Sequence, residues 1–115
     1  MIRKAIQTTE APLAIGPYSQ AIAISQSQTM LYISGQIPID PATSTIISGD
    51  IEAQTTQVMK NISAILKAGN LGFANIVMAT IYLIDLADFE KVNRVYSQFF
   101  LNMEIERYSL VPGES

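Results

Sequence analysis

One apolar run of nine residues constrains the fold of this chain more than any other feature. Residues 76–84 read Ile-Val-Met-Ala-Thr-Ile-Tyr-Leu-Ile, so apolar side chains would occupy both faces of an extended backbone there. Such a run is typical of a central strand whose sheet is covered on both sides. We therefore expect helices against one face of the sheet and a second apolar surface against the other.

The composition indicates where that second surface comes from. Of the 115 residues, 49% are hydrophobic and only 15% are charged. A small domain has a large surface relative to its volume, so one copy cannot bury all of this apolar content. Exposed apolar patches usually mark contact surfaces. We expect residues 1–115 to form a single domain that assembles into a homo-oligomer.

The charged and reactive residues exclude several function classes. The net charge is −3, from 7 basic and 10 acidic residues without a basic run, which argues against a nucleic-acid partner. Without Cys or His, the chain has no thiolate chemistry, no disulfide and no cysteine-ligated metal, and it lacks the usual general base and the commonest metal ligand. No signal peptide or membrane span is visible near the N-terminus, so we expect a cytoplasmic protein without a membrane partner.

Three strands are predicted in the first third of the chain. Residues 2–8 are expected to form a short edge strand, followed by a loop over residues 11–18, where Pro and Gly occur. Residues 19–25 and 30–33 are aliphatic runs, and the polar residues 26–29 between them are typical of a hairpin tip.

The second strand of this hairpin stops at a Ser-Gly pair. The sequence there is Ile33-Ser34-Gly35-Gln36-Ile37-Pro38-Ile39-Asp40-Pro41. Gly permits dihedral angles that other residues resist, and Pro cannot donate to a strand ladder. The backbone of Ser34 and Gly35 is therefore expected to leave the sheet at its rim, where another molecule can approach the main chain. A plain exit from a strand into a loop is the commoner alternative for such a pair.

Two helices are predicted after an irregular connection over residues 38–49. The first spans residues 51–67, between the N-cap residue Asp50 and a stop at Gly69. Its apolar face consists of Ile51, Thr55, Val58, Ile62 and Ile65. The second runs from Asp85 or Asp88 to about residue 100. Its apolar face consists of Phe89, Val92, Tyr96 and Phe99.

The order of elements predicts the fold class. With a further strand possible over residues 103–111, the order is β-β-β-α-β-α(-β), and the helices between strands cover one face of the sheet. This is an α+β arrangement in a single domain.

Three side chains outside the Ser-Gly pair are candidates for ligand contacts. Tyr18 stands where the loop enters a strand and can stack on a ligand or hydrogen-bond to it. Asn93 borders the apolar face of the second helix, where an amide needs partners. Arg107 can hold a carboxylate through two parallel hydrogen bonds. The commoner alternatives are a partly buried loop aromatic, a helix-to-loop hydrogen bond and a solvated arginine. No metal-ligand spacing, phosphate loop or nucleophile elbow is present.

Several blocks of the sequence resemble a known family. They are Ala-Ile-Gly-Pro-Tyr-Ser-Gln-Ala (14–21), Ile-Ser-Gly-Gln-Ile-Pro (33–38), Gly-Asp-Ile-Glu-Ala-Gln-Thr (49–55), Lys-Asn-Ile (60–62), Asp-Phe (88–89) and Val-Asn-Arg-Val-Tyr (92–96). Over residues 3–100 the chain resembles the Rid family, also called YjgF, of reactive-intermediate enamine/imine deaminases. The resemblance implies a chorismate-mutase-like fold in a homotrimer, with a central barrel and clefts between subunits.

The resemblance also implies an activity and a site. The activity is hydrolysis of 2-imino or 2-enamino acids to 2-keto acids and ammonia, without a cofactor. Tyr18, Ser34, Gly35 and Asn93 match positions that line the family's cleft, and Tyr18 of one subunit is expected to approach Ser34, Gly35 or Asn93 at a subunit boundary. Arg107 is the candidate for a carboxylate-binding Arg, and no catalytic residue is assigned. An imine is already electrophilic, so the protein mainly has to orient the substrate and a water.

The tail departs from the family pattern. The family has a Pro-Ala-Arg-Ser-type segment and then a last strand with an Ile-Glu-type pair, whereas here Arg107 follows residue 100 by seven residues within Glu-Arg-Tyr-Ser. Glu104, Glu106 and Glu114 are stand-ins for the late acid only by proximity. A missing strand leaves its neighbour with unpaired backbone groups. We expect that edge to stay unpaired rather than be covered by residues 103–111, and deaminase activity to be weak or absent.

Two alternatives to deamination stay open. One is a non-catalytic member of the same fold that binds a small ligand or stabilises proteins. The other is RNA cleavage or inhibition of translation, which has been attached to relatives. The acidic net charge and the lack of His disfavour the second alternative.

Overall fold

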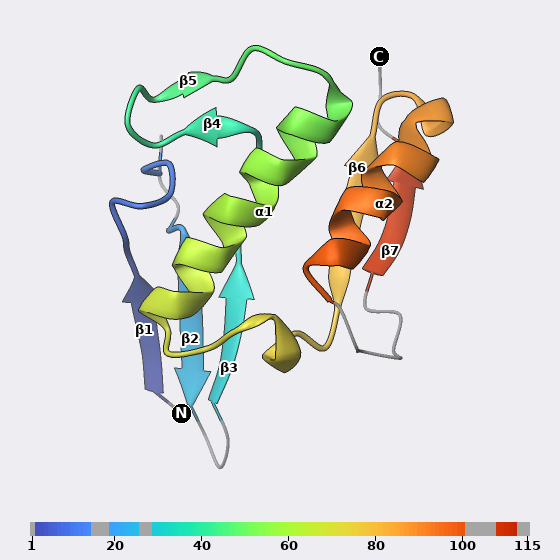
Figure 1. Cartoon of the computed structure of the whole chain (residues 1–115). Coiled ribbons are helices and arrows are strands. Elements are labelled where there is room, and N and C mark those ends of the chain that lie inside the picture. Colours follow the sequence, from blue (N-terminus) through green and yellow to red (C-terminus); the bar gives the residue numbers. More distant parts are fainter. Residues whose placement is uncertain (1, 15–18, 26–28, 101–107, 113–115) are drawn as a thin grey trace.

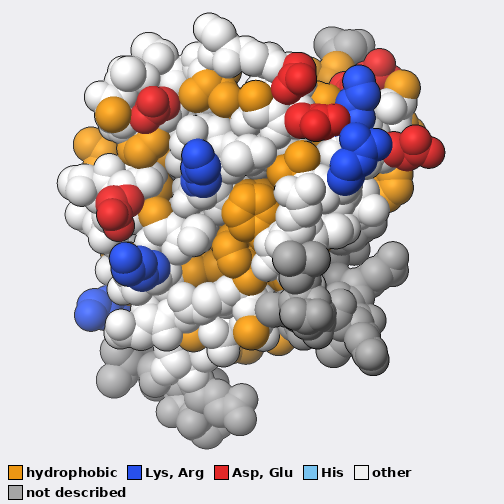
Figure 2. Space-filling model, viewed as in Figure 1, with side chains coloured by type: hydrophobic (Ala, Val, Ile, Leu, Met, Phe, Trp, Pro, Cys, Tyr) orange, Lys and Arg blue, Asp and Glu red, His pale blue; other side chains and the backbone are white. Residues whose placement is uncertain are grey.

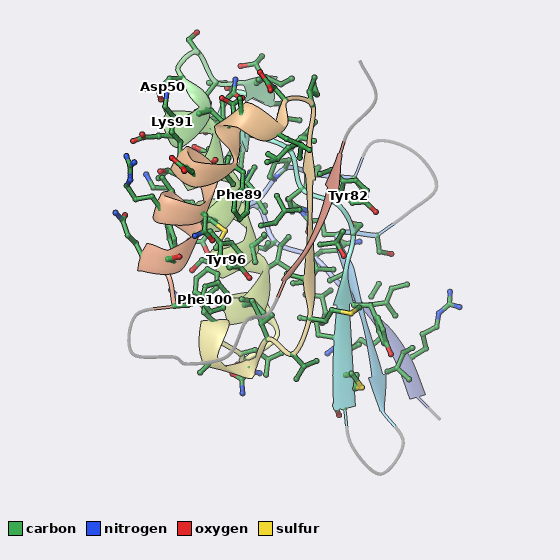
Figure 3. The ribbon with its side chains drawn as sticks, turned by 90° about the vertical axis from the view of Figure 1, so that its right-hand side faces the viewer. Asp50, Tyr82, Phe89, Lys91, Tyr96 and Phe100 are labelled. Atoms are coloured by element: carbon green, nitrogen blue, oxygen red, sulfur yellow. The ribbon has the colours of Figure 1, made fainter. Side chains whose placement is uncertain are left out.

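Two helices pack on one side of a set of short strands (Figures 1 and 3). The computed structural model describes residues 2–14, 19–25, 29–100 and 108–112. In chain order the elements are β1 (Ile2–Ile6), β2 (Ala21–Ser25), β3 (Thr29–Ile33), β4 (Ile39–Asp40), β5 (Thr45–Ile46), α1 (Ile51–Ala68), β6 (Ala79–Leu83), α2 (Phe89–Gln98) and β7 (Tyr108–Pro112). Short 3-10 helices at Phe73–Asn75 and Leu86–Asp88 precede β6 and α2. This is the mixed α+β architecture that the sequence predicts.

The strands form two main ladders. β1, β2 and β3 pair antiparallel in that order, with Ile6 opposite Ala21 and Ala21 opposite Ile33. β1 lies at one edge of this sheet, as predicted. β6 and β7 pair in parallel, from Ala79 opposite Tyr108 onward. The short β4 and β5 form a separate hairpin beside the N-terminal half of α1, at the upper left of Figure 1.

Capping explains why α1 begins and ends where the sequence predicts. The side chain of Asp50 accepts a hydrogen bond from Ala53 N–H at 2.9 Å, which satisfies one of the backbone donors left open at a helix start. At the other end, Gly69 N–H donates to the carbonyls of Ile65 and Leu66 at 3.1 and 3.0 Å. The helix spans 18 residues and extends one residue beyond the predicted end.

Two apolar clusters hold the helices against the strands. In the first, Ile65 of α1 is fully buried against Ala11 and Ala21. In the second, the rings of Tyr96 and Phe100 stack with centroids 4.7 Å apart and point inward from the C-terminal end of α2 (Figure 3). Burying a large apolar side chain contributes about 1.5–3 kcal/mol. These clusters fix both helices on the same side of the strands.

The opposite side of the strands is apolar and uncovered within one chain. Tyr82 of β6 is 71% exposed and projects away from the helices (Figure 3), and Ile84 just after β6 is 77% exposed. Other large apolar side chains that are exposed include Met30, Tyr32, Val77 and Met78. Helix side chains cover one face of β6 and the other face is open in a single chain, so the expected cover from another copy stays a prediction. Among the described residues β6 pairs only with β7, and it spans Ala79–Leu83 rather than the whole of residues 76–84.

The connection over residues 38–49 is more regular than expected. Ile39 pairs with Ile46 and Asp40 with Thr45 in a small hairpin. The side chain of Asp40 accepts from Ala42 N–H at 2.9 Å, and its carbonyl accepts from Ser44 N–H at 2.8 Å. Strands of two residues are too short to show an alternating pattern, so the sequence gives no strand signal there.

The expectation of an unpaired edge beside β6 is also wrong. β7 overlaps the predicted segment 103–111 and ends one residue beyond it. All five of its residues pair with β6. The connection between two parallel strands runs through α2, which is the usual route for such a crossover. Pairing with β7 satisfies backbone groups of β6 that would otherwise face water.

Candidate functional site

A pocket of about 200 Å³ opens where β3 ends. One wall is the loop at residues 12–14, and the other is the segment 34–37 with Ile39. Gln20 lies between them at the start of β2. The described lining residues carry no ionisable side chain, so the pocket offers apolar surface, amides, a hydroxyl and main-chain groups.

Ser34 ties the end of β3 to the start of β2. Its N–H donates to the carbonyl of Gln20 at 3.1 Å. Its hydroxyl is placed to donate to the carbonyl of Ser19 at 2.8 Å or to that of Gln20 at 2.9 Å. The expected release of the backbone from the sheet is therefore wrong for the Ser34 N–H. The hydroxyl hydrogen is used within the protein, and the oxygen keeps lone pairs that can accept.

Gly35 is the residue that leaves the sheet. In the described part of the chain its N–H has no hydrogen-bond partner, and no described atom lies within 4 Å of the place that a Cβ would take. Its φ angle lies outside the left-handed region that favours glycine. Neither backbone conformation nor packing thus requires glycine there. What its lack of a side chain provides is open space and an accessible N–H donor within the pocket.

The first wall is held by a buried amide that the sequence analysis did not single out. Gln20 is 3% exposed. Its Nε2 donates to the carbonyls of Thr8, Ala11 and Pro12 at 3.0, 3.2 and 2.6 Å, and its Oε1 accepts from Thr8 N–H at 2.7 Å. The signal that could have found Gln20 is a polar residue at the entrance to an aliphatic strand.

A second buried amide holds the other wall. Asn61 of α1 is 0% exposed. Its Nδ2 donates to the carbonyl of Ile39 at 2.9 Å and to that of Ile37 at 3.4 Å. Its Oδ1 accepts from Gln57 Nε2 at 2.9 Å. The signal in the sequence is its place beside Ile62, next to the apolar face of the helix.

The structure brings two of the five predicted site residues together. Ser34 and Gly35 line the pocket. Asn93 is half-buried on α2 and does not line this pocket within one chain. Tyr18 and Arg107 lie outside the described residues. The assignment of these residues to a ligand site stays a prediction.

The described charged side chains lie outside this pocket. On the helical face, acidic and basic side chains are interspersed, and the described residues form no basic patch there (Figure 2). Arg94 of α2 and Glu52 of α1 form an exposed ion pair at 3.3 Å.

Within the described ranges, no group of three or more Asp, Glu, His or Cys side chains is placed to hold a metal ion. No helix in those ranges is long and apolar enough to cross a membrane.

Fold and pocket together define a small α+β protein with a pocket at a sheet rim whose described lining is uncharged. Comparison with known proteins gives its family. Residues 8–111 match the family model described as "Endoribonuclease L-PSP". Over 100 residues the chain is 44% identical to human "2-iminobutanoate/2-iminopropanoate deaminase", covering 87% of this chain and 71% of the relative.

Solved structures agree with this match. The crystal structure of YyfA from Yersinia pestis, described as a Rid-family protein of unknown function, is similar with a TM-score of 0.92 and 39% identity, over 99% of this chain and 88% of that one. E. coli TdcF with bound serine is similar with a TM-score of 0.83 and 37% identity, over 95% and 84% of the two chains. The chain belongs to the Rid family, also called YjgF.

The environment of Gly35 predicts that a side chain there is tolerated by the fold. Gly35→Ala should leave the free energy of unfolding within about 0.5 kcal/mol of the original or raise it slightly, because the φ angle is compatible and the space is open. Gly49→Ala is the matched control, since Gly49 has a φ of +147° and a Cβ there would lie 2.9 Å from the Cβ of Ala53. It should cost more than about 1 kcal/mol. Urea unfolding measures both, and an equal loss in the two variants would contradict this account of Gly35.

Proposed function

We propose that this protein hydrolyses 2-imino or 2-enamino acids to 2-keto acids and ammonia. The observation that carries the proposal is the Gly35 N–H, a donor without a protein partner in the described chain, in an uncharged pocket beside apolar walls. A small 2-imino acid has matching parts, namely a carboxylate that accepts hydrogen bonds and a short aliphatic chain. The name of the human relative supports the same substrate class.

The chemistry needs little from the protein. Water adds across the C=N bond of the imine, and the resulting carbinolamine loses ammonia and leaves the keto group. Because the imine carbon is already electrophilic, the main task is to hold substrate and water in a reactive arrangement. In this proposal the Gly35 N–H orients the carboxylate, and Leu13 and Ile37 contact the aliphatic chain. The serine bound to E. coli TdcF supports a ligand of amino-acid size.

Three further predicted site residues, Tyr18, Asn93 and Arg107, extend this proposal beyond the described pocket. We propose that Tyr18 and Asn93 contribute from a neighbouring subunit or an adjoining surface, and that Arg107 pairs with the substrate carboxylate. In the sequence Arg107 directly precedes β7. In this proposal the pairing of β7 with β6 anchors the main chain next to this arginine. A charge-assisted hydrogen bond of this kind contributes about 1.5–3 kcal/mol.

A second candidate function is ligand binding without turnover. The observation that favours it is the absence of an ionisable side chain among the described residues of the pocket. A hydrolase usually has a group that transfers protons. Binding of the keto acid without acceleration of the hydrolysis would identify this case.

RNA cleavage is not the function proposed here, although the family model carries an endoribonuclease name. The net charge of −3 provides no electrostatic attraction for a polyanion. The pocket is also small and uncharged in its described part.

The activity test uses 2-iminobutanoate generated in situ by a threonine dehydratase. The chain should accelerate its loss, and Gly35→Ala should lower that acceleration by about tenfold or more because the methyl group occupies the space beside the N–H donor. Gly72→Ala is the control, since a Cβ there also meets no atom within 4 Å and Gly72 lies outside the pocket. Equal activity of the two variants would contradict the assignment of the site, and no activity in the unaltered chain would contradict the proposed reaction.

The uncovered face of the strands predicts the oligomer. We propose that Tyr82, Ile84 and their exposed apolar neighbours are buried between three copies. Light scattering should give about three times the 12.6 kDa mass of the chain. Tyr82→Glu should yield smaller species because it places a charge on that face, whereas Ser63→Glu on the exposed surface of α1 should not. A folded monomer at micromolar concentration would refute the trimer.

A further inference from the structure

Two buried amide side chains serve the same pocket. Among the residues whose burial the structure describes, Gln20 and Asn61 are the only buried amides. Gln20 directly precedes β2 and Asn61 lies in α1, and both donate to main-chain carbonyls of the pocket walls. We propose that Gln20 and Asn61 are positioning residues that fix the two walls and thereby set the affinity for the ligand. This inference rests on the proposed function for the identity of that ligand.

Gln20 acts on the wall formed by residues 12–14. Its amide accepts from the N–H and donates to the carbonyl of Thr8, as a peptide unit of a neighbouring strand would. It thus continues the β1–β2 ladder beyond its last pair, Ile6 and Ala21. The same Nε2 reaches the carbonyl of Pro12 at 2.6 Å, which fixes the first residue of the wall.

Asn61 acts on the opposite wall. Its Nδ2 reaches the carbonyls on both sides of Pro38, and Pro38 itself accepts from Ile47 N–H at 2.9 Å. Gln57 donates to the Oδ1 of Asn61, which orients the amide so that its donors face the wall. The segment that carries Gly35 into the pocket therefore continues into residues held by α1.

A purely structural role does not explain why both buried amides lie at one pocket. Burying an amide is costly unless it is hydrogen-bonded, and an apolar residue usually fills a core position with less risk. Here most of the carbonyls that the amides reach, those of Thr8, Ala11, Pro12 and Ile37, lie in irregular segments, and one belongs to Ile39 at the start of β4. Because both segments line the pocket, a shift in either one changes the distance between the apolar walls and Gly35.

The experiment compares ligand affinity at matched stability. The full-length variants are Asn61→Asp and Gln20→Glu, which keep the shape of the side chain but replace the donor by an oxygen. The probe is 2-oxobutanoate, the keto acid product, measured by calorimetry. The control is Met59→Ala, a buried change in the other apolar cluster, at a temperature where all variants are folded. Gln57→Leu is a milder third test variant. Gln57 is only half-buried, and its replacement leaves Asn61 in place without the hydrogen bond that orients its amide.

The expected result is a dissociation constant raised about tenfold by Asn61→Asp or Gln20→Glu, and about threefold by Gln57→Leu. In the deaminase assay KM should rise more than kcat falls. Met59→Ala should lower the melting temperature without changing the dissociation constant. Two results would overturn the inference. One is that Met59→Ala weakens binding as much as the amide variants do at the same loss of stability. The other is that Gln57→Leu and the amide variants bind 2-oxobutanoate normally.

These outcomes separate the inference from the proposed function. If the amide variants weaken binding of 2-oxobutanoate but the unaltered chain does not hydrolyse 2-iminobutanoate, the positioning role stands and the proposed reaction is wrong. If the unaltered chain hydrolyses the imine but the amide variants behave like Met59→Ala, the proposed reaction stands and the positioning role is wrong. A chain that does not bind 2-oxobutanoate at all overturns the inference as stated.

Discussion

The packing of α1 on the three-stranded sheet is the constraint on which the rest of the structure depends. Ile65 is fully buried against Ala21 and Ala11, and this contact fixes the helix over β2. One helical turn earlier, Asn61 reaches the segment that follows β3. The same helix that closes the core therefore holds one wall of the pocket, so the position of the candidate site is tied to the stability of the fold.

The uncharged pocket and the uncovered apolar face are two consequences of one composition. With 15% charged residues, the chain has few ionisable groups, and the described lining of the pocket offers main-chain groups, amides and a hydroxyl instead. With 49% hydrophobic residues, it also has more apolar surface than one helical layer covers, as the exposure of Tyr82 and Ile84 shows. A reaction that needs orientation more than proton transfer suits the first consequence, and the proposed trimer suits the second.

The sequence predicted the elements whose signals are local. Asp50, Gly69 and the spacing between them define α1, and the aliphatic runs around residues 26–29 define the β2–β3 pair. It did not predict β4 and β5, which are too short for a period, or the pairing of β7, which depends on a partner distant in the chain. The roles of Gln20 and Asn61 were also missed, since no local pattern tells which distant carbonyl a buried amide meets. Ser34 and Gly35 stood out from the residues alone, as the exit from a strand.

A crystal structure of the chain with 2-oxobutanoate tests the central claim most directly. The claim is that the pocket at the end of β3 binds a small keto or imino acid through the main chain of Gly35. The predicted result is a carboxylate oxygen within hydrogen-bond distance of the Gly35 N–H, with the aliphatic end of the ligand toward Leu13 and Ile37. A ligand bound away from residues 34–37, or a protein group occupying the Gly35 N–H in the crystal, would contradict it.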